Sequence, residues 1–112
     1  MNPDPASLLG ALAETTRLRI VHLLVRQGEL CVCDLVGILQ IHQPKISRHL
    51  AILRNAGIIR GRREGTWIHY RIDPQIPTWA SQAIRHMLEG CDGAPYRDDL
   101  LRLNAESRVS CK

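Results

Sequence analysis

Aromatic residues are scarce in this chain, which has two Trp, two Tyr and no Phe among its 112 residues. A single domain of this length buries a limited core, and this one has few large side chains to fill it. Burial of an apolar helix face against a second copy would ease the shortage. No apolar run is long enough to cross a membrane, and the first residues have neither a basic nor an apolar signal segment. We therefore expect a cytoplasmic protein.

Patterns typical of enzymes are also missing. The sequence has no Gly-rich phosphate loop and no Ser, His and Asp set, and no strand–helix–strand pattern of a thiol oxidoreductase surrounds its cysteines. We therefore expect a protein that is not an enzyme. Thiols stay reduced in the cytoplasm, so its cysteines are expected to be free thiols or ligands rather than disulfides. They are Cys31, Cys33, Cys91 and Cys111.

The composition is that of a globular, basic protein. It is 45% hydrophobic and 23% charged, with a net charge of +4 and a pI of about 9.2. A basic excess of this size fits a nucleic-acid partner, although many other soluble domains carry one. The position of the basic residues is more informative than their number.

Hydrophobic spacing predicts five helices and one hairpin. The helices are expected at 7–13, 15–27, 32–39, 43–56 and about 77–90, and the strands at 58–60 and 67–72. We expect one winged helix-turn-helix and dimerisation domain over residues 1–90. Residues 91–112 are predicted to form a partly disordered C-terminal extension with a helical turn or two over 96–104.

The third and fourth predicted helices form a helix-turn-helix pattern, because a tight connection at 40–42 joins them. The polar face of the second helix presents Gln43, Lys45, Ser47 and Arg48. Gln pairs with adenine and Arg with guanine, whereas Lys and Ser suit phosphates. The same face, taken alone, is also typical of a solvated amphipathic helix.

A basic hairpin follows this helix and makes the pattern more specific. Its predicted turn, 61–66, carries Arg62 and Arg63 between two strands. Such a wing can straddle the DNA backbone or enter the minor groove. Helix, turn, helix and wing in this order predict a mostly α fold with a β-hairpin wing, a winged helix-turn-helix that binds DNA.

Two cysteines stand at the start of the third predicted helix. With Cys31 as N-cap, Asp34 occupies the N3 position of a capping box, and the positive helix end favours thiolate over thiol. Residues two apart on a regular helix point about 200° apart. A soft ion held by Cys31 and Cys33 is therefore expected to distort the helix and unwind its first turn. The alternative is that both are small buried apolar residues.

The segment 43–57 resembles the signature of the ArsR/SmtB family of metal-responsive repressors. The pattern at 16–20 and the tyrosine at Tyr70 agree with it, whereas His42 stands where a Ser often caps the recognition helix. The resemblance covers about residues 8–88. It implies a homodimer through the first and last long helices, a palindromic operator, and operator contacts from the four polar residues of the recognition helix.

The segment 29–35 resembles the thiolate motif of the arsenite-responsive branch, whose effectors are trivalent arsenic and antimony. The resemblance implies a repressor of an arsenic-resistance operon that leaves DNA when arsenite or antimonite binds Cys31 and Cys33. That motif can carry a third cysteine where this chain has apolar residues, including Val36. A third ligand is left to Cys91, Cys111 or a small molecule, and two thiols would suffice for a monomethylated arsenical.

Other readings of the cysteine pair stay open. A cadmium or lead sensor shares the pair but adds cysteines near its N-terminus, and residues 1–30 have none. A zinc or nickel sensor uses Asp and His on the last long helix, which offers only His86. A thiol-redox-responsive repressor of the same fold would use the pair differently, and a thiol or metal-carrying module is a more distant alternative.

Overall fold

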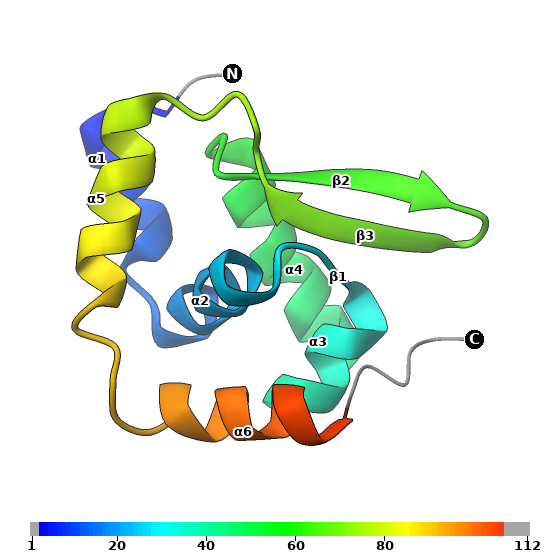
Figure 1. Ribbon diagram of the computed structural model, residues 1–112. Helices are drawn as coiled ribbons and strands as arrows, with labels where there is room; N and C mark the ends of the chain where they lie inside the picture. The colour runs from blue at the N-terminus through cyan, green and yellow to red at the C-terminus, as the bar shows by residue number, and fades with distance from the viewer. Residues whose placement is uncertain (1–2, 107–112) are drawn as a thin grey trace.

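The computed structural model describes residues 3–106, which form six helices and a small three-stranded sheet (Figure 1). The predicted mostly α fold with a hairpin wing is confirmed. In chain order the elements are α1 (Pro5–Leu12), α2 (Thr15–Gln27), β1 (Leu30–Cys31), α3 (Val32–Leu39), α4 (Gln43–Asn55), β2 (Ile59–Glu64), β3 (Trp67–Ile72), α5 (Thr78–Leu88) and α6 (Tyr96–Glu106).

The core forms where α2, α3 and α4 pack together. The predicted apolar stripe of α4 is confirmed, since Ile46, Leu50 and Leu53 are all buried. They meet buried residues such as Ile20 of α2 and Leu35 of α3 in one cluster. This packing fixes the inner face of α4 and leaves its polar face outside.

Local capping explains where the first two helices begin and end. The side chain of Asp4 accepts a hydrogen bond from the Ser7 N–H at 2.8 Å, and Pro5 occupies the first turn, so α1 starts earlier than its apolar residues indicate. The predicted bounds of α2 are confirmed, and it ends at Gly28 with φ of 99°. That backbone angle favours glycine.

The hairpin differs from the prediction at its tip. Strand β2 continues through the basic residues to Glu64, so the turn is confined to the two residues Gly65 and Thr66. Gly61 was expected in the turn, but it pairs with Tyr70 inside the ladder. A Cβ atom there would lie 2.9 Å from the tyrosine ring, so this glycine allows close packing rather than a turn.

A third strand, β1, was not predicted because two residues are too short to show an alternating pattern. Its residue Leu30 pairs with Tyr70 and its residue Cys31 with His69, both antiparallel. The strand order is β1-β3-β2, so β3 lies in the centre. The cysteine segment is therefore part of the same sheet as the wing.

Helix α6 is longer than the predicted turn or two and packs on α2 and α3, along the lower edge of Figure 1. Its Asp99 is fully buried. The Asp99 carboxylate accepts hydrogen bonds from Arg19 Nε at 2.9 Å, Arg19 Nη2 at 2.8 Å and Arg102 Nη2 at 3.1 Å. The partner of Asp99 on α2 lies 80 residues earlier, so local spacing gave no sign of this contact.

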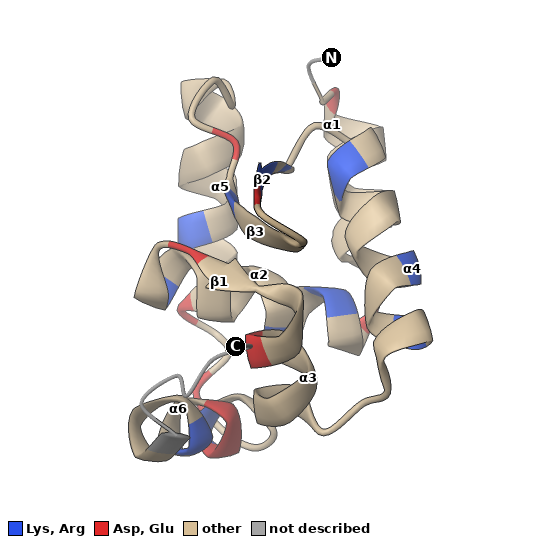
Figure 2. Ribbon diagram, turned by 90° about the vertical axis from the view of Figure 1, so that its right-hand side faces the viewer, with Lys and Arg blue, Asp and Glu red and all other residues tan. Residues whose placement is uncertain are grey.

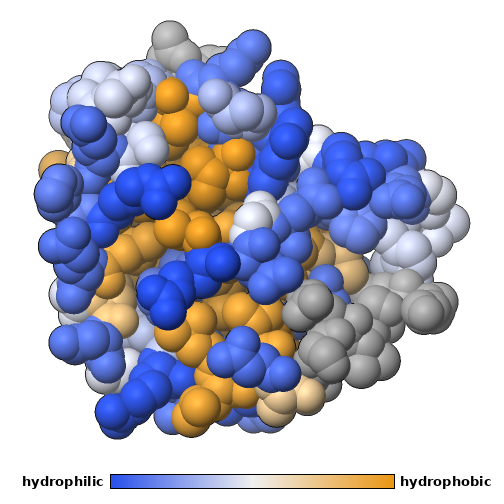
Figure 3. Space-filling model, in the orientation of Figure 1, coloured by the Kyte–Doolittle hydropathy of each residue, from blue (hydrophilic) through white to orange (hydrophobic). Residues whose placement is uncertain are grey.

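Large apolar side chains stay exposed on the side opposite the wing. Helices α1 and α5 both lie on that side (Figure 1), and they carry Leu9 at 57% and Trp79 at 43% exposure. An apolar band with hydrophilic residues on both flanks also crosses the face shown in Figure 3. Within residues 3–106, none of the helices is both long and apolar enough to cross a membrane.

Candidate nucleic-acid interface and thiol site

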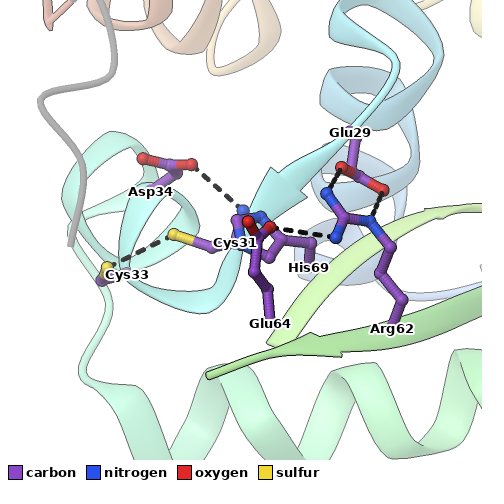
Figure 4. A network of polar contacts seen from close by, with 7 residues as sticks. All are labelled: Glu29, Cys31, Cys33, Asp34, Arg62, Glu64 and His69. Carbon is purple, nitrogen blue, oxygen red and sulfur yellow. Dashed lines mark hydrogen bonds and ion pairs between the residues drawn. The ribbon is translucent and has the colours of Figure 1, made fainter. Parts of the chain in front are cut away.

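The two cysteine sulfurs already lie together, with Cys31 Sγ 3.3 Å from Cys33 Sγ (Figure 4). Sulfur ligands about 2.3 Å from one tetrahedral ion lie about 3.8 Å apart, so this pair is close enough to share an ion. The expected distortion of α3 is not needed for the sulfurs to meet. Cys31 is extended, with φ of −86° and ψ of 168°, and only Cys33 belongs to the helix, so the regular helical angle does not apply.

The predicted capping box at the start of α3 is confirmed. The Cys31 N–H donates to the Asp34 carboxylate at 3.0 Å, and the Asp34 N–H donates back to the Cys31 sulfur. Burial raises the pKa of the Cys31 thiol, and the Asp34 carboxylate raises it further, while the backbone N–H of Asp34 lowers it. The net direction is opposite to the expected thiolate preference, because the residue Cys31 is only 2% exposed.

Of the two candidate third ligands, Cys91 lies within the described residues, and it does not join the pair. Cys91 follows α5, where its thiol donates weakly to the Met87 carbonyl at 4.0 Å. Across residues 3–106, no group of three or more His, Cys, Asp or Glu side chains is placed to hold a metal ion. Cys111 lies outside the described residues.

Helix α4 presents the predicted polar face to solvent. Gln43, Ser47 and Arg48 are exposed and Lys45 is half-buried, while the opposite face packs into the core. Figure 2 shows Lys and Arg positions along this helix. His42 is the N-cap, as predicted from the start at Gln43, but its side chain makes no capping hydrogen bond.

The two wing arginines differ in their surroundings. Both are exposed, but the Arg62 guanidinium donates to both carboxylate oxygens of Glu29, at 2.9 and 2.7 Å, and to Glu64 at 3.0 Å (Figure 4). The hydrogen bonds to Glu29 and then to Glu64 raise the pKa of Arg62 above its ordinary value. Arg63 is exposed on β2, on the opposite face of the strand from Arg62.

One pocket joins Cys33 of the cysteine pair to the recognition helix and the wing. Its volume is about 180 Å³. Cys33 lies at its α3 side, Gln43 and Ser47 at its α4 side, and Trp67 and Tyr70 at its β3 side. The thiol that would bind an ion and two predicted DNA contacts therefore line the same small space.

Two arginines of the pattern at 16–20 hold the scaffold, and sequence reasoning did not assign them this role. Arg17 donates from Nε to the Ala11 carbonyl at 2.6 Å and from Nη1 to His49 Nδ1 at 3.1 Å. Arg19 pairs with Asp99 of α6. They tie α2 to α1, α4 and α6, so the position of the recognition helix depends on them. The two arginines in this short pattern could have indicated a structural role, but the sequence does not show which residues they contact.

Comparison with known proteins identifies the family of this chain. Residues 14–60 match the model for the bacterial regulatory proteins of the arsR family. An arsenical resistance operon repressor of Escherichia coli (strain K12) is 55% identical over 80 residues, which are 71% of this chain and 68% of that protein. The chain belongs to the ArsR family.

Solved structures of similar regulators agree with this assignment. HlyU from Vibrio cholerae N16961 is 31% identical with a TM-score of 0.69, over 78% of this chain and 91% of that one. The AntR antimony-specific transcriptional repressor is 33% identical with a TM-score of 0.62, over 90% of this chain and 78% of that one. The chain is therefore a winged helix-turn-helix transcriptional regulator rather than an enzyme.

Proposed function

We propose that this protein represses an arsenic-resistance operon and leaves its operator when trivalent arsenic or antimony binds Cys31 and Cys33. The observation that carries the proposal is the 3.3 Å separation of the two sulfurs at the start of α3, directly before the recognition helix. The arsenical resistance repressor and the antimony-specific repressor, both similar to this chain, support this effector class. Soft thiolate ligands favour soft ions over hard ones.

Binding of arsenite exchanges oxygen for sulfur on arsenic. Arsenous acid, As(OH)₃, reacts with two thiols to give two S–As bonds and two water molecules, and one hydroxyl stays on arsenic. No oxidation is involved. A third thiol, from Cys91 or Cys111, would displace the last hydroxyl in the same way. The proton of each thiol leaves with one displaced hydroxide as water.

The DNA-binding face is proposed to be the polar side of α4 together with the wing. Gln43 and Arg48 would read base edges, and Lys45 and Ser47 would contact phosphates. The exposed Arg63 would contact the backbone from the wing. Arg62 is also predicted to contact DNA from the wing. No observation tests that contact, and the Arg62 guanidinium already binds Glu29 and Glu64.

A homodimer would place two such faces on a palindromic operator. The exposed Leu9 of α1 and Trp79 of α5 support an interface through these helices, because monomers rarely leave such side chains clustered on one side. Half-sites should lie about 34–36 Å apart, one DNA turn, or a multiple of it. A Leu9→Asp variant should shift the protein to monomer in sedimentation experiments, and an unchanged dimer would contradict this interface.

A mobility-shift assay with four candidate effectors tests the proposal. The effector-free protein should bind its operator in preference to random DNA, and arsenite or antimonite should release it. Cadmium and peroxide, run beside them, distinguish the cadmium sensor and the redox sensor. Equal binding to operator and random DNA would contradict the repressor function. Release by cadmium or peroxide alone would show that the effector is not arsenite or antimonite.

A further inference from the structure

We infer that Glu29 and Arg62 form a tether that carries the state of the thiol pair to the wing. The inference rests on the proposed function, in which Cys31 and Cys33 bind the effector. The tether is the bidentate ion pair between Arg62 of β2 and Glu29, the residue before β1 (Figure 4). Arg62 is therefore a positioning residue in addition to its predicted contact with DNA.

The sheet places the tether beside the thiols. Cys31 of β1 pairs with His69 of β3, and His69 pairs with Arg62 of β2, so the three residues form one row across the sheet. Paired residues in neighbouring strands point to the same face. Glu64 is two residues from Arg62 along β2, so it shares this face, and the hydrogen bonds from Arg62 place the Glu29 carboxylate there as well. Cys31, the proposed ligand, and both carboxylate partners of Arg62 thus lie on the same face of the sheet.

The two carboxylates that bind Arg62 are not equivalent. Glu64 belongs to β2 itself, two residues along, so its 3.0 Å contact joins the wing only to the wing. Glu29 lies beyond the central strand β3, so its contacts at 2.7 and 2.9 Å join the wing to the segment that leads into Cys31. Only the Glu29 contact of these two can transmit a movement of β1 to β2.

The position of Cys31 explains why a tether is needed. The sulfurs already meet with the capping box intact, so an ion has no need to unwind α3. Cys31 is at once a ligand and a residue of β1, so a shift that accompanies ion binding reaches Glu29 through two peptide units. The bidentate geometry fixes both the distance and the orientation of the Arg62 guanidinium relative to Glu29. A displaced Glu29 therefore draws the wing away from its DNA-binding position.

Operator affinity measured with and without saturating arsenite tests the tether, and the ratio of the two affinities is the release factor. Glu29→Gln removes the ion pair and keeps the size of the side chain. Glu64→Gln is the matched control, since it removes a carboxylate from the same arginine; it also removes the 3.6 Å contact between Glu64 and His69 of β3, which stays within the wing. We expect Glu29→Gln to lower the release factor about three- to fivefold, the upper range for an exposed ion pair, and Glu64→Gln to leave it unchanged.

A double-mutant cycle and amide hydrogen exchange complete the test. The double variant Arg62→Gln with Glu29→Gln should have the same release factor as either single variant, because the two residues act as one unit. Without any effector, Glu29→Gln should speed exchange of the β1–β3 amides about threefold, and Glu64→Gln should not. Equal exchange in both variants would overturn the tether whatever arsenite does. Failure of arsenite to release the unmodified protein would overturn the proposed function instead.

Discussion

The two helices of the helix-turn-helix begin in different ways. Helix α3 starts with a complete capping box, in which Cys31 and Asp34 bond each other's N–H groups. Helix α4 starts after His42, whose side chain makes no capping hydrogen bond, and has Pro44 in its first turn. Side chains of the protein cap the N-terminus of α3, whereas the N-cap side chain of α4 makes no hydrogen bond to the helix.

This difference matches the two tasks of the motif. A sulfur is a poor N-cap compared with a Ser hydroxyl, so Cys31 is better explained by a ligand role than by helix stability. At α4 the open start faces solvent with Gln43 and Ser47 beside it, where DNA would supply partners for the polar groups. On the proposed function, the start of α3 senses the effector and the start of α4 reads DNA, so variants at each should affect one task alone.

The largest effect is expected for Cys31→Ser. Serine is the better N-cap, so operator binding should persist, but a hydroxyl cannot replace the thiolate, and release should need more than ten times as much arsenite. Mobility-shift titration measures both quantities. Cys91→Ser, titrated beside it, measures how much the candidate third thiol contributes to the arsenite response. Release of the Cys31 variant at the unmodified protein's arsenite concentration would show that the site is misassigned.

Gln43→Ala should weaken specific DNA binding next. Loss of a bidentate contact to adenine costs about 1–3 kcal/mol of discrimination, so operator affinity should fall about tenfold while affinity for random DNA changes little. Gln75→Ala, at an exposed position between β3 and α5, is the matched control. Equal losses on operator and random DNA would argue against base reading by Gln43.

Arg63→Ala should change the salt dependence rather than the specificity. Each phosphate contact contributes about 0.9 to the slope of log affinity against log salt, so the slope should fall by about that amount for every DNA sequence. Arg97→Ala removes an exposed arginine from α6 and should leave the slope unchanged. Identical slopes for the two variants would remove Arg63 from the interface.

Asp34→Asn should give the smallest effect, which is confined to the thiol. The neutral amide still accepts from the Cys31 N–H, so α3 should lose less than about 1 kcal/mol. The carboxylate raises the pKa of Cys31, so its loss should lower that pKa and shift the pH midpoint of Cys31 alkylation downward, as followed by mass spectrometry. Asp98→Asn on α6 is the control. An upward shift would reverse the assigned electrostatic role of Asp34.

The sequence predicted α4 well because its information is local. The buried stripe of Ile46, Leu50 and Leu53 follows from helical spacing, and the start at Gln43 agrees with Pro44 in the first turn. The capping box of α3 was equally local. Strand β1 and helix α6 were missed or shortened because their stability comes from distant partners.

The thiol site shows the same limit. The sequence located both cysteines but not their closeness, which depends on the extended backbone of Cys31 and its pairing with His69 in β3. The ion pair of Arg62 with Glu29 spans 33 positions, so a charged wing residue was predicted only as a DNA contact. The sequence shows which side chains are charged or can bind an ion, but it does not show which distant residues they contact.

The central claim is that filling the thiol pair removes the protein from DNA. Equilibrium binding to a fluorescent operator duplex, with bound arsenic counted in the same samples, tests it most directly. The account predicts that release follows arsenic uptake at one arsenic per Cys31–Cys33 pair and that both are lost in Cys31→Ser. An operator complex that persists with one arsenic bound to every chain would contradict it.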